Sequence, residues 1–349
     1  MEALKKKDEK YMARCLQLAQ NGLPKAFPNP LVGAVVVYKD QIIGEGYHQE
    51  YGKAHAEVNA IAAVKDTSLL PHSTIYVNLE PCAHFGKTPP CADLIIKHKL
   101  KRVVVGVVDS FSKVCGQGIQ RMREAGIEVT VGVLEHECRT INKRFFTFHE
   151  KQRPFVTLKW AQTADRFIDL PRKNTGQRPL KITNNHSSRL VHKLRSEHDA
   201  ILIGTKTALM DNPKLTTRLW PGKDPIRIVI DRSLKVPQES TVFNETCYVV
   251  TEKNDEINYA KKIQLKFDNK LIERLLKKLH ELKIQTLLVE GGSLTLTDFI
   301  RNSMWDEAYV FTNNVEIHEG IKAPELSKKA IFTQHISNDV LNVYTNYET

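Results

Sequence analysis

The sequence predicts two α/β domains in one chain, and two observations support this. Short runs rich in valine and isoleucine alternate with stretches of helical spacing through both halves of the chain, an order typical of layered α/β domains. A length of 349 residues is also long for one hydrophobic core but comfortable for two. We therefore expect a first domain over residues 1–150 and a second over residues 151–349.

The first domain is expected to begin with a helix over residues 8–21, where apolar residues recur at helical spacing. A Lys-Asp turn then joins two runs with the composition of strands. In "GQGIQRMREAGIEVTVG" a glycine ends a helical pattern before a strand pattern begins. Further strands and helices are expected in this order: strands over 31–38, 41–48, 73–79 and 101–109, and helices over 55–65, 92–100 and 134–151.

The second domain repeats the alternation, beginning with the strand-like "RPFVTLKWAQ". The Leu-rich segment "KLIERLLKKLHEL" has the spacing of a long helix, and "GGSLTLTDFI" opens another helix after a strand. The expected strands cover 153–162, 200–204, 226–231, 284–290 and 307–312, and the expected helices cover 186–197, 270–282 and the segment from 291.

The composition is that of an ordinary soluble globular protein, with 41% hydrophobic and 26% charged residues. No apolar run approaches the roughly 20 residues that cross a bilayer. The basic N-terminus also lacks the apolar segment of a signal peptide. We therefore expect a cytoplasmic protein without membrane contact, in which the six cysteines are free thiols.

The chain is basic, and the excess charge is spread over both halves. Residues 1–150 hold 20 basic and 16 acidic side chains, and residues 151–349 hold 31 and 24, which gives net charges of +4 and +7. Such a distribution favours anionic ligands. Phosphorylated small molecules satisfy it as well as nucleic acids do, so charge alone leaves both classes open.

The most informative segment is "PCAHFGKTPPC", residues 81–91, in which Cys82 and Cys91 flank a loop. Catalytic zinc usually has three protein ligands and an open position for water. His55 supplies a third ligand at the start of a predicted helix, with Glu57 two residues later. His-x-Glu followed by Pro-Cys and a second Cys is the signature of zinc deaminases, in which the glutamate is the acid/base and not a ligand. Zinc lowers the pKa of its water, and the carboxylate carries the proton to the departing amine.

Each of these residues also has an ordinary structural explanation. A buried cysteine is often only a small apolar side chain, and His55 or Glu57 alone could serve just the start of a helix. Their occurrence together, at two strand-to-helix junctions, favours a zinc deaminase. The cysteines are separated by eight residues, where the usual signature has two. The enlarged loop places His84 and Lys87 beside the metal site.

The segments "HAE", "EPCAHFGKTPPC", "FPNPLVGAVVV" and "IIGEGYH" resemble the N-terminal domain of the bifunctional deaminase/reductase family of riboflavin biosynthesis. The resemblance extends over nearly the whole chain and implies a cytidine-deaminase-like α/β/α domain. It implies deamination of 2,5-diamino-6-ribosylamino-4(3H)-pyrimidinone 5′-phosphate. Asn29, His48, His84 and Lys87 correspond to residues that hold this substrate. A turn role for Asn29 and a solvated position for Lys87 remain alternatives.

The second half resembles the reductase domain of the same family in "FVTLKWAQTADRFI", "HSSRLVHKLRSEHDAILIGTKTALMDNPKLTTR", "PIRIVID" and "LLVEGGSLTLTDFI". The resemblance implies a fold like dihydrofolate reductase and NADPH-dependent reduction of the ribosyl group to ribityl. It places four residues on the substrate side: Arg195, Leu215, Arg218 and Glu290. It places Ala161, Thr207, Asp211 and the loop at Gly292 and Ser293 on the cofactor side, and Lys181 is a sixth candidate there, at a position where the family has another residue.

The residues of the second half give compatible evidence of their own. No Gly-x-Gly-x-x-Gly motif is present, so a Rossmann site is not supported. The glycine pair in "EGGSLT" would present backbone N–H groups to an anion at a helix N-terminus, although a plain glycine-rich turn also fits. Two positions depart from the usual family pattern: Arg166 replaces a turn glycine, and Lys181 replaces a tryptophan within "GQRPLKIT". A lysine there would contact a cofactor phosphate or ribose, unless this segment is only a surface loop.

The sequence therefore predicts a zinc deaminase joined to an NADPH reductase, with a phosphorylated pyrimidine as substrate, no nucleic-acid partner, and a homodimer or homotetramer as its assembly. Three alternatives stay open. A deaminase with a non-catalytic reductase-like domain is one. A tRNA-type deaminase with an appended domain is another, but it would need an aromatic-lined groove, and 7% aromatics without clustering near the motif gives little support. A zinc-stabilised binding module would need a fourth closed ligand, which the motif region does not offer.

Overall fold

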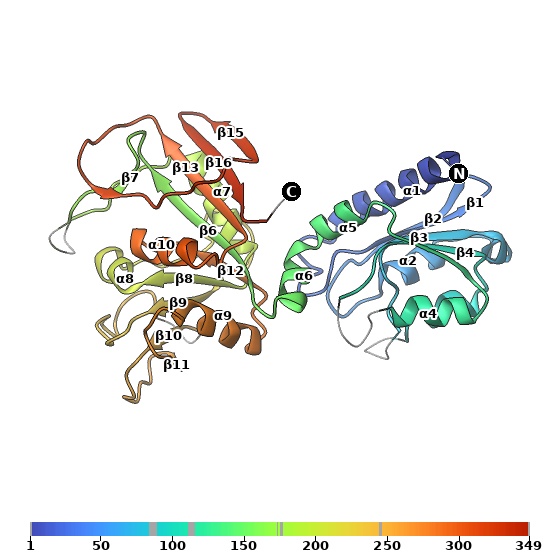
Figure 1. Ribbon diagram of the computed structural model, residues 1–349, viewed down its shortest axis with the longest axis horizontal. Coiled ribbons are helices and arrows are strands. Elements are labelled where there is room, and N and C mark those ends of the chain that lie inside the picture. Colours follow the sequence, from blue (N-terminus) through green and yellow to red (C-terminus); the bar gives the residue numbers. More distant parts are fainter. Residues whose placement is uncertain are drawn as a thin grey trace. The chain divides into compact units, whose positions relative to one another are not determined.

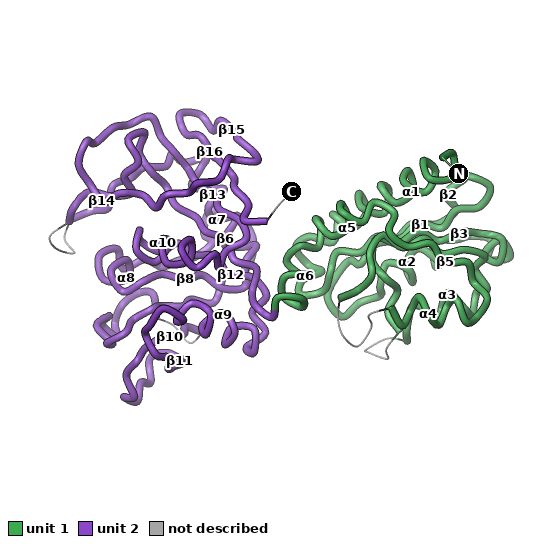
Figure 2. The backbone as a smooth tube through the Cα atoms, in the orientation of Figure 1, with its two compact units in different colours: residues 1–151 green, residues 152–349 purple. Residues whose placement is uncertain are grey.

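The computed structural model describes residues 2–83, 89–110, 116–172, 174, 177–243 and 246–347. The chain divides into two compact units, residues 1–151 and 152–349 (Figures 1 and 2). Both units are mixed α/β, so the predicted fold class is confirmed. Among the helices that the structure describes, none combines the length and apolar character required to span a bilayer.

Unit 1 is built on a five-stranded sheet with the order β2-β1-β3-β4-β5. β1 is antiparallel to β2 and β3, whereas β3, β4 and β5 are parallel. The strands are β1 (Gly33–Tyr38), β2 (Gln41–Tyr47), β3 (Thr74–Leu79), β4 (Arg102–Val107) and β5 (Glu128–Val131). The helices are α1 (Glu2–Gln20), α2 (Ala56–Ala62), the 3-10 helix η1 (Thr67–His72), α3 (Cys91–Lys97), α4 (Gln117–Glu124), α5 (Glu135–Ile141) and α6 (Lys143–Glu150).

Helices cover both faces of this sheet (Figure 1). Val35 and Val37 of β1 lie in a core shared with residues of α1, α5 and α6. Ala34 and Val36 point the other way, into a core shared with α2, α3 and α4. A strand buried on both faces carries apolar residues at successive positions, which is why β1 reads as one continuous apolar run. Unit 1 is therefore the predicted α/β/α domain.

The single helix predicted over residues 134–151 is wrong, because the chain forms α5 and α6 with a break at Asn142. Asn142 has φ −108° and ψ 20°, outside the helical region. Its side chain accepts a hydrogen bond from Leu31 N at 2.7 Å and donates one to Leu31 O at 2.9 Å. Asn78 also donates to Leu31 O, at 3.0 Å. The helix breaks where one amide has to hold a distant backbone segment, and helical periodicity carries no sign of that.

Unit 2 contains a nine-stranded sheet with the order β11-β10-β9-β8-β12-β6-β13-β16-β15, and a separate β14-β7 pair. The strands from β11 to β13 in this order are parallel, and β16 and β15 follow antiparallel. The strands are β6 (Phe155–Gln162), β7 (Phe167–Asp169), β8 (Ala200–Gly204), β9 (Ile226–Ile230), β10 (Tyr248–Thr251), β11 (Lys261–Gln264), β12 (Thr286–Val289), β13 (Glu307–Asn313), β14 (Ile321–Lys322), β15 (Phe332–Ile336) and β16 (Asp339–Thr345). The helices are α7 (Asn185–Ser196), α8 (Thr205–Asp211), α9 (Leu271–Glu281) and α10 (Ser293–Arg301).

Two layers of helix also enclose the sheet of unit 2. α9 and α10 pack against one face, and α7 and α8 pack against the other. Because β9, β8, β12 and β6 are parallel neighbours, their carboxyl ends meet at one edge of the sheet. Ligands of open α/β sheets bind at this edge.

Candidate active sites

His55, Cys82 and Cys91 come together in unit 1, with their ligand atoms all within 4.8 Å of one another. His55 Nδ1 lies 3.6 Å from Cys82 Sγ and 3.4 Å from Cys91 Sγ. When a nitrogen and a sulfur bind one zinc ion at two corners of a tetrahedron, their usual bond lengths put them about 3.6 Å apart. The donor set and its spacing therefore fit a zinc ion.

The ends of local elements place these three side chains. His55 is the N-cap of α2, and Cys91 is the first residue of α3. Pro90 precedes α3 with φ −57°, so its ring fixes the backbone where the helix begins. The Cys91 N–H donates a hydrogen bond to Cys82 Sγ at 3.3 Å, which ties the two cysteines together.

The electrostatics of the cluster shift the pKa values of its two cysteines in opposite directions. The hydrogen bond from the Cys91 side chain, with further bonds from His55 and the Cys91 N–H, lowers the pKa of Cys82 against the effect of burial. The same interaction with Cys82 raises the pKa of Cys91, and burial adds to that shift. The cluster therefore favours a thiolate at Cys82, the state in which cysteine binds zinc.

Glu57 lies beside this cluster and is only 3% exposed. Burial raises the pKa of Glu57 to about 7, although the nearby His55 opposes the shift. A carboxyl group that titrates near neutral pH can both accept and return a proton. The position and the pKa of Glu57 both suit acid/base chemistry at the metal cluster.

Asn29 and His48 form a pair next to His55. His48 Nδ1 lies 3.1 Å from the Ala54 carbonyl, and His48 Nε2 lies 3.1 Å from Asn29 Nδ2. Because a carbonyl can only accept, Nδ1 carries the proton and Nε2 accepts from the Asn29 amide. Burial lowers the pKa of His48, so its ring is neutral at pH 7. The rings of His48 and His55 meet edge to face, 5.5 Å apart.

Two of the expected substrate residues, Asn29 and His48, are thus brought to the metal cluster. The other two, His84 and Lys87, lie outside the described residues.

Glu80, directly before the Pro-Cys motif, is a residue that the sequence analysis missed. Its carboxylate is buried and accepts hydrogen bonds from four backbone N–H groups, those of Gly116 (2.9 Å), Gly118 (2.9 Å), Asp109 (3.2 Å) and Ile119 (3.3 Å). These bonds fix the segment that carries Cys82 to the start of α4. The sequence carries one sign of this contact, the glycine at position 118. A Cβ there would lie 2.1 Å from the Pro81 carbonyl oxygen, so the close approach requires glycine.

The second site is a pocket of about 620 Å³ in unit 2, at the carboxyl ends of β9, β8, β12 and β6. Its size is within the usual range of small-molecule and cofactor sites, roughly 300–1,000 Å³. The pocket is lined by all six residues expected on the cofactor side and by one expected on the substrate side: Ala161, Lys181, Thr207, Asp211, Gly292, Ser293 and Glu290.

The glycine pair after β12 allows close packing at the pocket wall. A Cβ on Gly291 would lie 2.7 Å from Thr295 Cβ, and one on Gly292 would lie 3.3 Å from Thr207 Oγ1. Gly292 is the N-cap of α10, and Ser293 is its first residue. The N–H groups of the first turn of α10, which have no partner within the helix, therefore lie at the pocket, where an anion would be stabilised.

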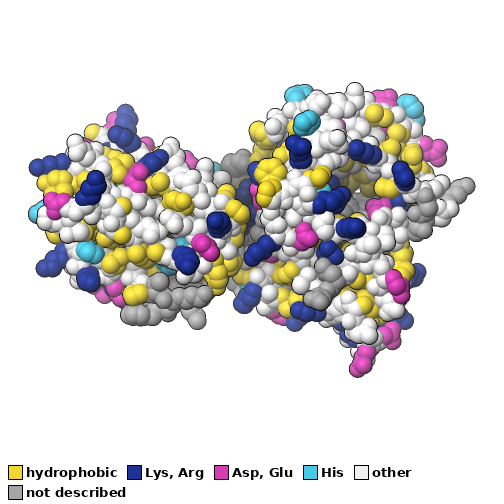
Figure 3. All heavy atoms as spheres, turned by 180° about the vertical axis from the view of Figure 1, so that it is seen from behind, with side chains coloured by type: hydrophobic (Ala, Val, Ile, Leu, Met, Phe, Trp, Pro, Cys, Tyr) yellow, Lys and Arg dark blue, Asp and Glu magenta, His cyan; other side chains and the backbone are white. Residues whose placement is uncertain are grey.

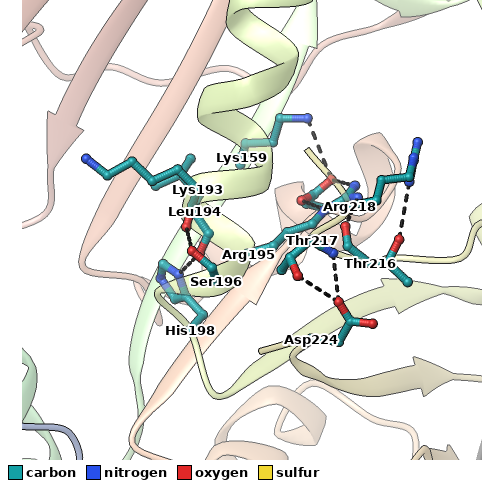
Figure 4. Close-up of polar contacts among 11 residues, drawn as sticks. Lys159, Lys193, Leu194, Arg195, Ser196, His198, Thr216, Thr217, Arg218 and Asp224 are labelled. Atoms are coloured by element: carbon teal, nitrogen blue, oxygen red, sulfur yellow. Dashed lines mark hydrogen bonds and ion pairs between the residues drawn. The ribbon is translucent and has the colours of Figure 1, made fainter. Parts of the chain in front are cut away.

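An ion cluster borders the pocket, and two of its members, Lys159 and Glu290, belong to the lining. Arg195 of α7 binds both carboxylate oxygens of Glu290 at 2.8 Å, and Lys159 Nζ lies 3.6 Å from the same carboxylate. Burial alone would raise the pKa of Glu290, but Arg195 and Lys159 outweigh it and lower the pKa to about 2. Glu290 is thus a fixed anion. Figure 4 shows Lys159 and Arg195 with the polar contacts around them.

Comparisons with known proteins match a protein family to each half of the chain. The family model for the cytidine and deoxycytidylate deaminase zinc-binding region matches residues 5–107, and the model for the RibD C-terminal domain matches residues 154–315. The riboflavin biosynthesis protein RibD of Aquifex aeolicus is 42% identical over 334 residues, which cover 93% of this chain and 92% of that protein. The chain belongs to the RibD family.

Other relatives match over a similar length. RibD of Bacillus amyloliquefaciens is 37% identical over 332 residues, covering 91% of this chain and 87% of that protein. Among solved structures, a diaminohydroxyphosphoribosylaminopyrimidine deaminase/5-amino-6-(5-phosphoribosylamino)uracil reductase of Thermotoga maritima has a TM-score of 0.84 and 34% identity, covering 97% of this chain and 98% of that chain. RibD of Acinetobacter baumannii has a TM-score of 0.86 and 27% identity, covering 98% and 99%. The predicted family is confirmed.

The remaining residues expected on the substrate side of this RibD chain lie outside the pocket lining. Arg218 is exposed, with Nη1 3.4 Å from Thr216 Oγ1. Leu215 is buried, at 3% exposure. Arg195 connects this loop to the pocket by donating to the Thr216 carbonyl at 3.1 Å, as Figure 4 shows. Lys and Arg side chains are prominent on the face of unit 2 in Figure 3.

Arg172 is a second residue that the sequence analysis missed. It lines the pocket, forms an ion pair with Asp211 and binds Asp169 at 2.7 Å. Its Nη1 also donates to the Met210 carbonyl at 3.0 Å. Arg172 thus holds Asp211, an expected cofactor residue, in place. The sequence around Arg172 contains several basic residues, so nothing in it distinguished Arg172 from the others.

Arg166, where the family pattern has a glycine, occupies a left-handed turn with φ 66°. Its N–H donates to the Thr163 carbonyl at 3.0 Å, and its own carbonyl accepts from Ala323 N at 2.9 Å. Backbone hydrogen bonds therefore hold an arginine in a conformation that glycine adopts at lower cost.

Proposed function

We propose that this chain is a bifunctional enzyme of riboflavin biosynthesis. Unit 1 hydrolytically deaminates 2,5-diamino-6-ribosylamino-4(3H)-pyrimidinone 5′-phosphate, and unit 2 reduces the ribosyl group of the product to ribityl with NADPH. One observation carries the proposal: a buried Glu57 lies beside a zinc-compatible His55–Cys82–Cys91 cluster, in a chain whose other unit has the reductase pocket.

In the deaminase unit, His55, Cys82 and Cys91 would hold the zinc ion. When bound, zinc lowers the pKa of a water molecule so that water can attack the ring carbon that bears the amine. Glu57 accepts the proton of that water and delivers it to the departing amine, because its pKa near neutral allows both transfers. A neutral His48, oriented by Asn29, contacts the substrate next to His55.

The enlarged loop between the two cysteines would complete the deaminase site. We propose that His84 and Lys87 bind the phosphorylated substrate, with Lys87 neutralising negative charge.

In the reductase unit, the ionised Glu290 would accept hydrogen bonds from ribosyl hydroxyl groups, and Arg195 and Lys159 keep it charged and fixed in position. Arg218, exposed on the neighbouring loop, would bind the substrate phosphate together with the turn at Leu215. NADPH, when bound, supplies the hydride.

The proposed cofactor site follows the pocket wall. The start of α10, at Gly292 and Ser293, would bind the cofactor diphosphate, flanked by Thr207 and Asp211. Ala161 and Lys181 would contact the nicotinamide end of the cofactor.

Two assays on the zinc-loaded protein test the proposal. Ammonia release from the diaminopyrimidinone phosphate tests unit 1, and loss of NADPH absorbance on supplying the deaminated product tests unit 2. We expect both activities from one chain. Ammonia release without any NADPH oxidation would leave only the deaminase, and affinity for RNA without turnover of the pyrimidine would overturn both assignments.

A cytoplasmic location and a homodimer or homotetramer remain predictions. Fractionation of cells and light scattering of the purified protein would test them directly.

A further inference from the structure

The acidic side chains that line the pocket of unit 2 are all paired within the protein. Arg172 binds two of them, and Lys159 and Arg195 bind the third. The three are Asp169, Asp211 and Glu290. A ligand of this pocket therefore meets acids that are already neutralised.

Two lysines of the lining lack an anionic partner among the described residues. Lys181 Nζ has one long contact, 3.4 Å from Asn185 Oδ1. Lys206 is exposed at the second position of α8, and within the described ranges neither a hydrogen bond nor an ion pair engages its ammonium group. The pocket thus offers two positive charges to an anionic ligand.

Strand order places these lysines at opposite ends of the pocket. Four neighbouring strands, from β9 to β6, span roughly 14 Å at their usual spacing. Lys206 lies at the β8–β9 end, since Thr205 Oγ1 donates to the Ile230 carbonyl at 2.8 Å. Lys181 lies at the other end, since the neighbouring Ile182 carbonyl accepts from Asn313 of β13 at 3.0 Å.

The proposed reaction fixes the direction of the cofactor. The nicotinamide has to meet the substrate near Glu290, which follows β12, on the side of β6. The other half of the dinucleotide, the adenosine, then extends toward β8 and β9. NADPH differs from NADH only by a phosphate ester on the adenosine ribose, so the distinguishing charge falls at the Lys206 end.

We infer that Lys206 binds this ester phosphate and makes the reductase select NADPH over NADH. The inference rests on the proposed reductase function and adds to it a specificity-determining residue. A lysine is suited to the role because its compact charge on a flexible stem can follow a phosphate. Lys181, at the nicotinamide end, contacts groups that the two cofactors share, so it strengthens binding of both without discriminating between them.

Calorimetry with NADPH and with NADH on the full-length chain tests the inference. Lys206→Gln should weaken NADPH binding about tenfold or more, the usual weight of a hydrogen bond to a charged group, and leave the Kd of NADH unchanged. Lys181→Gln should weaken both cofactors by the same factor. Lys235→Gln, an exposed lysine outside the pocket lining, is the matched control and should change neither Kd.

Adenosine 2′,5′-bisphosphate and adenosine 5′-phosphate give a second readout, since they differ by the same ester phosphate. Lys206→Gln should abolish the preference of the protein for the bisphosphate. Equal weakening of NADPH and NADH by this variant, or no weakening of either, would overturn the inference but not the proposed reductase function. A wild-type protein that binds neither dinucleotide would overturn the proposed reductase and the inference with it.

Discussion

Replacing Glu290 with glutamine is expected to destabilise unit 2, because it leaves two largely buried cations without their anion. Arg195 binds the carboxylate through two contacts of 2.8 Å, and Lys159 lies 3.6 Å away. The pKa of Glu290 is lowered from 4.5 to about 2. At ~1.4 kcal/mol per pKa unit, this shift corresponds to about 3 kcal/mol of stability. Removing one partner of a buried ion pair costs a similar ~3–5 kcal/mol.

The effect should depend on pH in a defined direction. The pKa of Glu290 is lower in the folded chain than in the unfolded one, so the stabilisation is complete above about pH 4.5 and is lost as the pH falls toward 2. The difference in unfolding free energy between wild type and Glu290→Gln should therefore be largest at pH 7 and shrink below pH 4.5.

Tryptophan fluorescence during urea unfolding measures this free energy for unit 2 alone, because Trp160, Trp220 and Trp305 all lie in that unit. Glu252→Gln is the matched control: Glu252 also binds an arginine at 2.8 Å, but at the surface, and its loss should not be measurable. A loss below about 1 kcal/mol for Glu290→Gln, or equal losses in the two variants, would refute the reasoning.

Three further predictions concern other parts of the chain. Cys82→Ser should abolish zinc binding in metal analysis, whereas Cys138→Ser, at a buried thiol outside the cluster, should retain full occupancy; zinc retained in both would remove Cys82 from the site. Glu80→Ala should remove the carboxylate that accepts the Gly118 N–H, so this amide should exchange hydrogen much faster than in wild type. Unchanged exchange would contradict the role given to Glu80. Arg166→Gly should remove the cost of holding an arginine in a left-handed conformation. After the entropy cost of glycine is subtracted, the free energy of unfolding should rise by up to about 1 kcal/mol. A lower stability in urea would show that the arginine side chain has a partner of its own.

The parts of this molecule that sequence predicts are those set by residue type and local spacing. His55, Glu57, Cys82 and Cys91 are predictable as a group, because zinc deamination needs these side chains and few other functions use them together. Most of the buried parallel strands are predictable for a similar reason, since burial on both faces gives a continuous apolar run in the sequence. β10 is also buried and parallel, and it was missed.

What could not be predicted depends on distant backbone. The break at Asn142 arises from hydrogen bonds to Leu31, more than a hundred residues away. The role of Glu80 arises from backbone N–H groups beyond β4, and that of Arg172 from an ion pair with Asp211, 39 residues away, beside its contact with Asp169. None of these partners is visible in local periodicity.

The short strands β7, β14 and β15 were not predicted either. They run to five residues or fewer, and nearly all of their residues are exposed or half-buried, so hydrophobic patterning hardly marks them.

The central claim is that two separate sites act in sequence, and Glu57→Gln tests it most directly. The amide cannot shuttle a proton, so ammonia release should fall by about a hundredfold or more while zinc is retained. With the diaminopyrimidinone phosphate as substrate, NADPH oxidation should fall to the same extent, and supplying the deaminated product should restore it fully. NADPH oxidation that continues without deamination, or that stays absent when the deaminated product is supplied, would contradict the account.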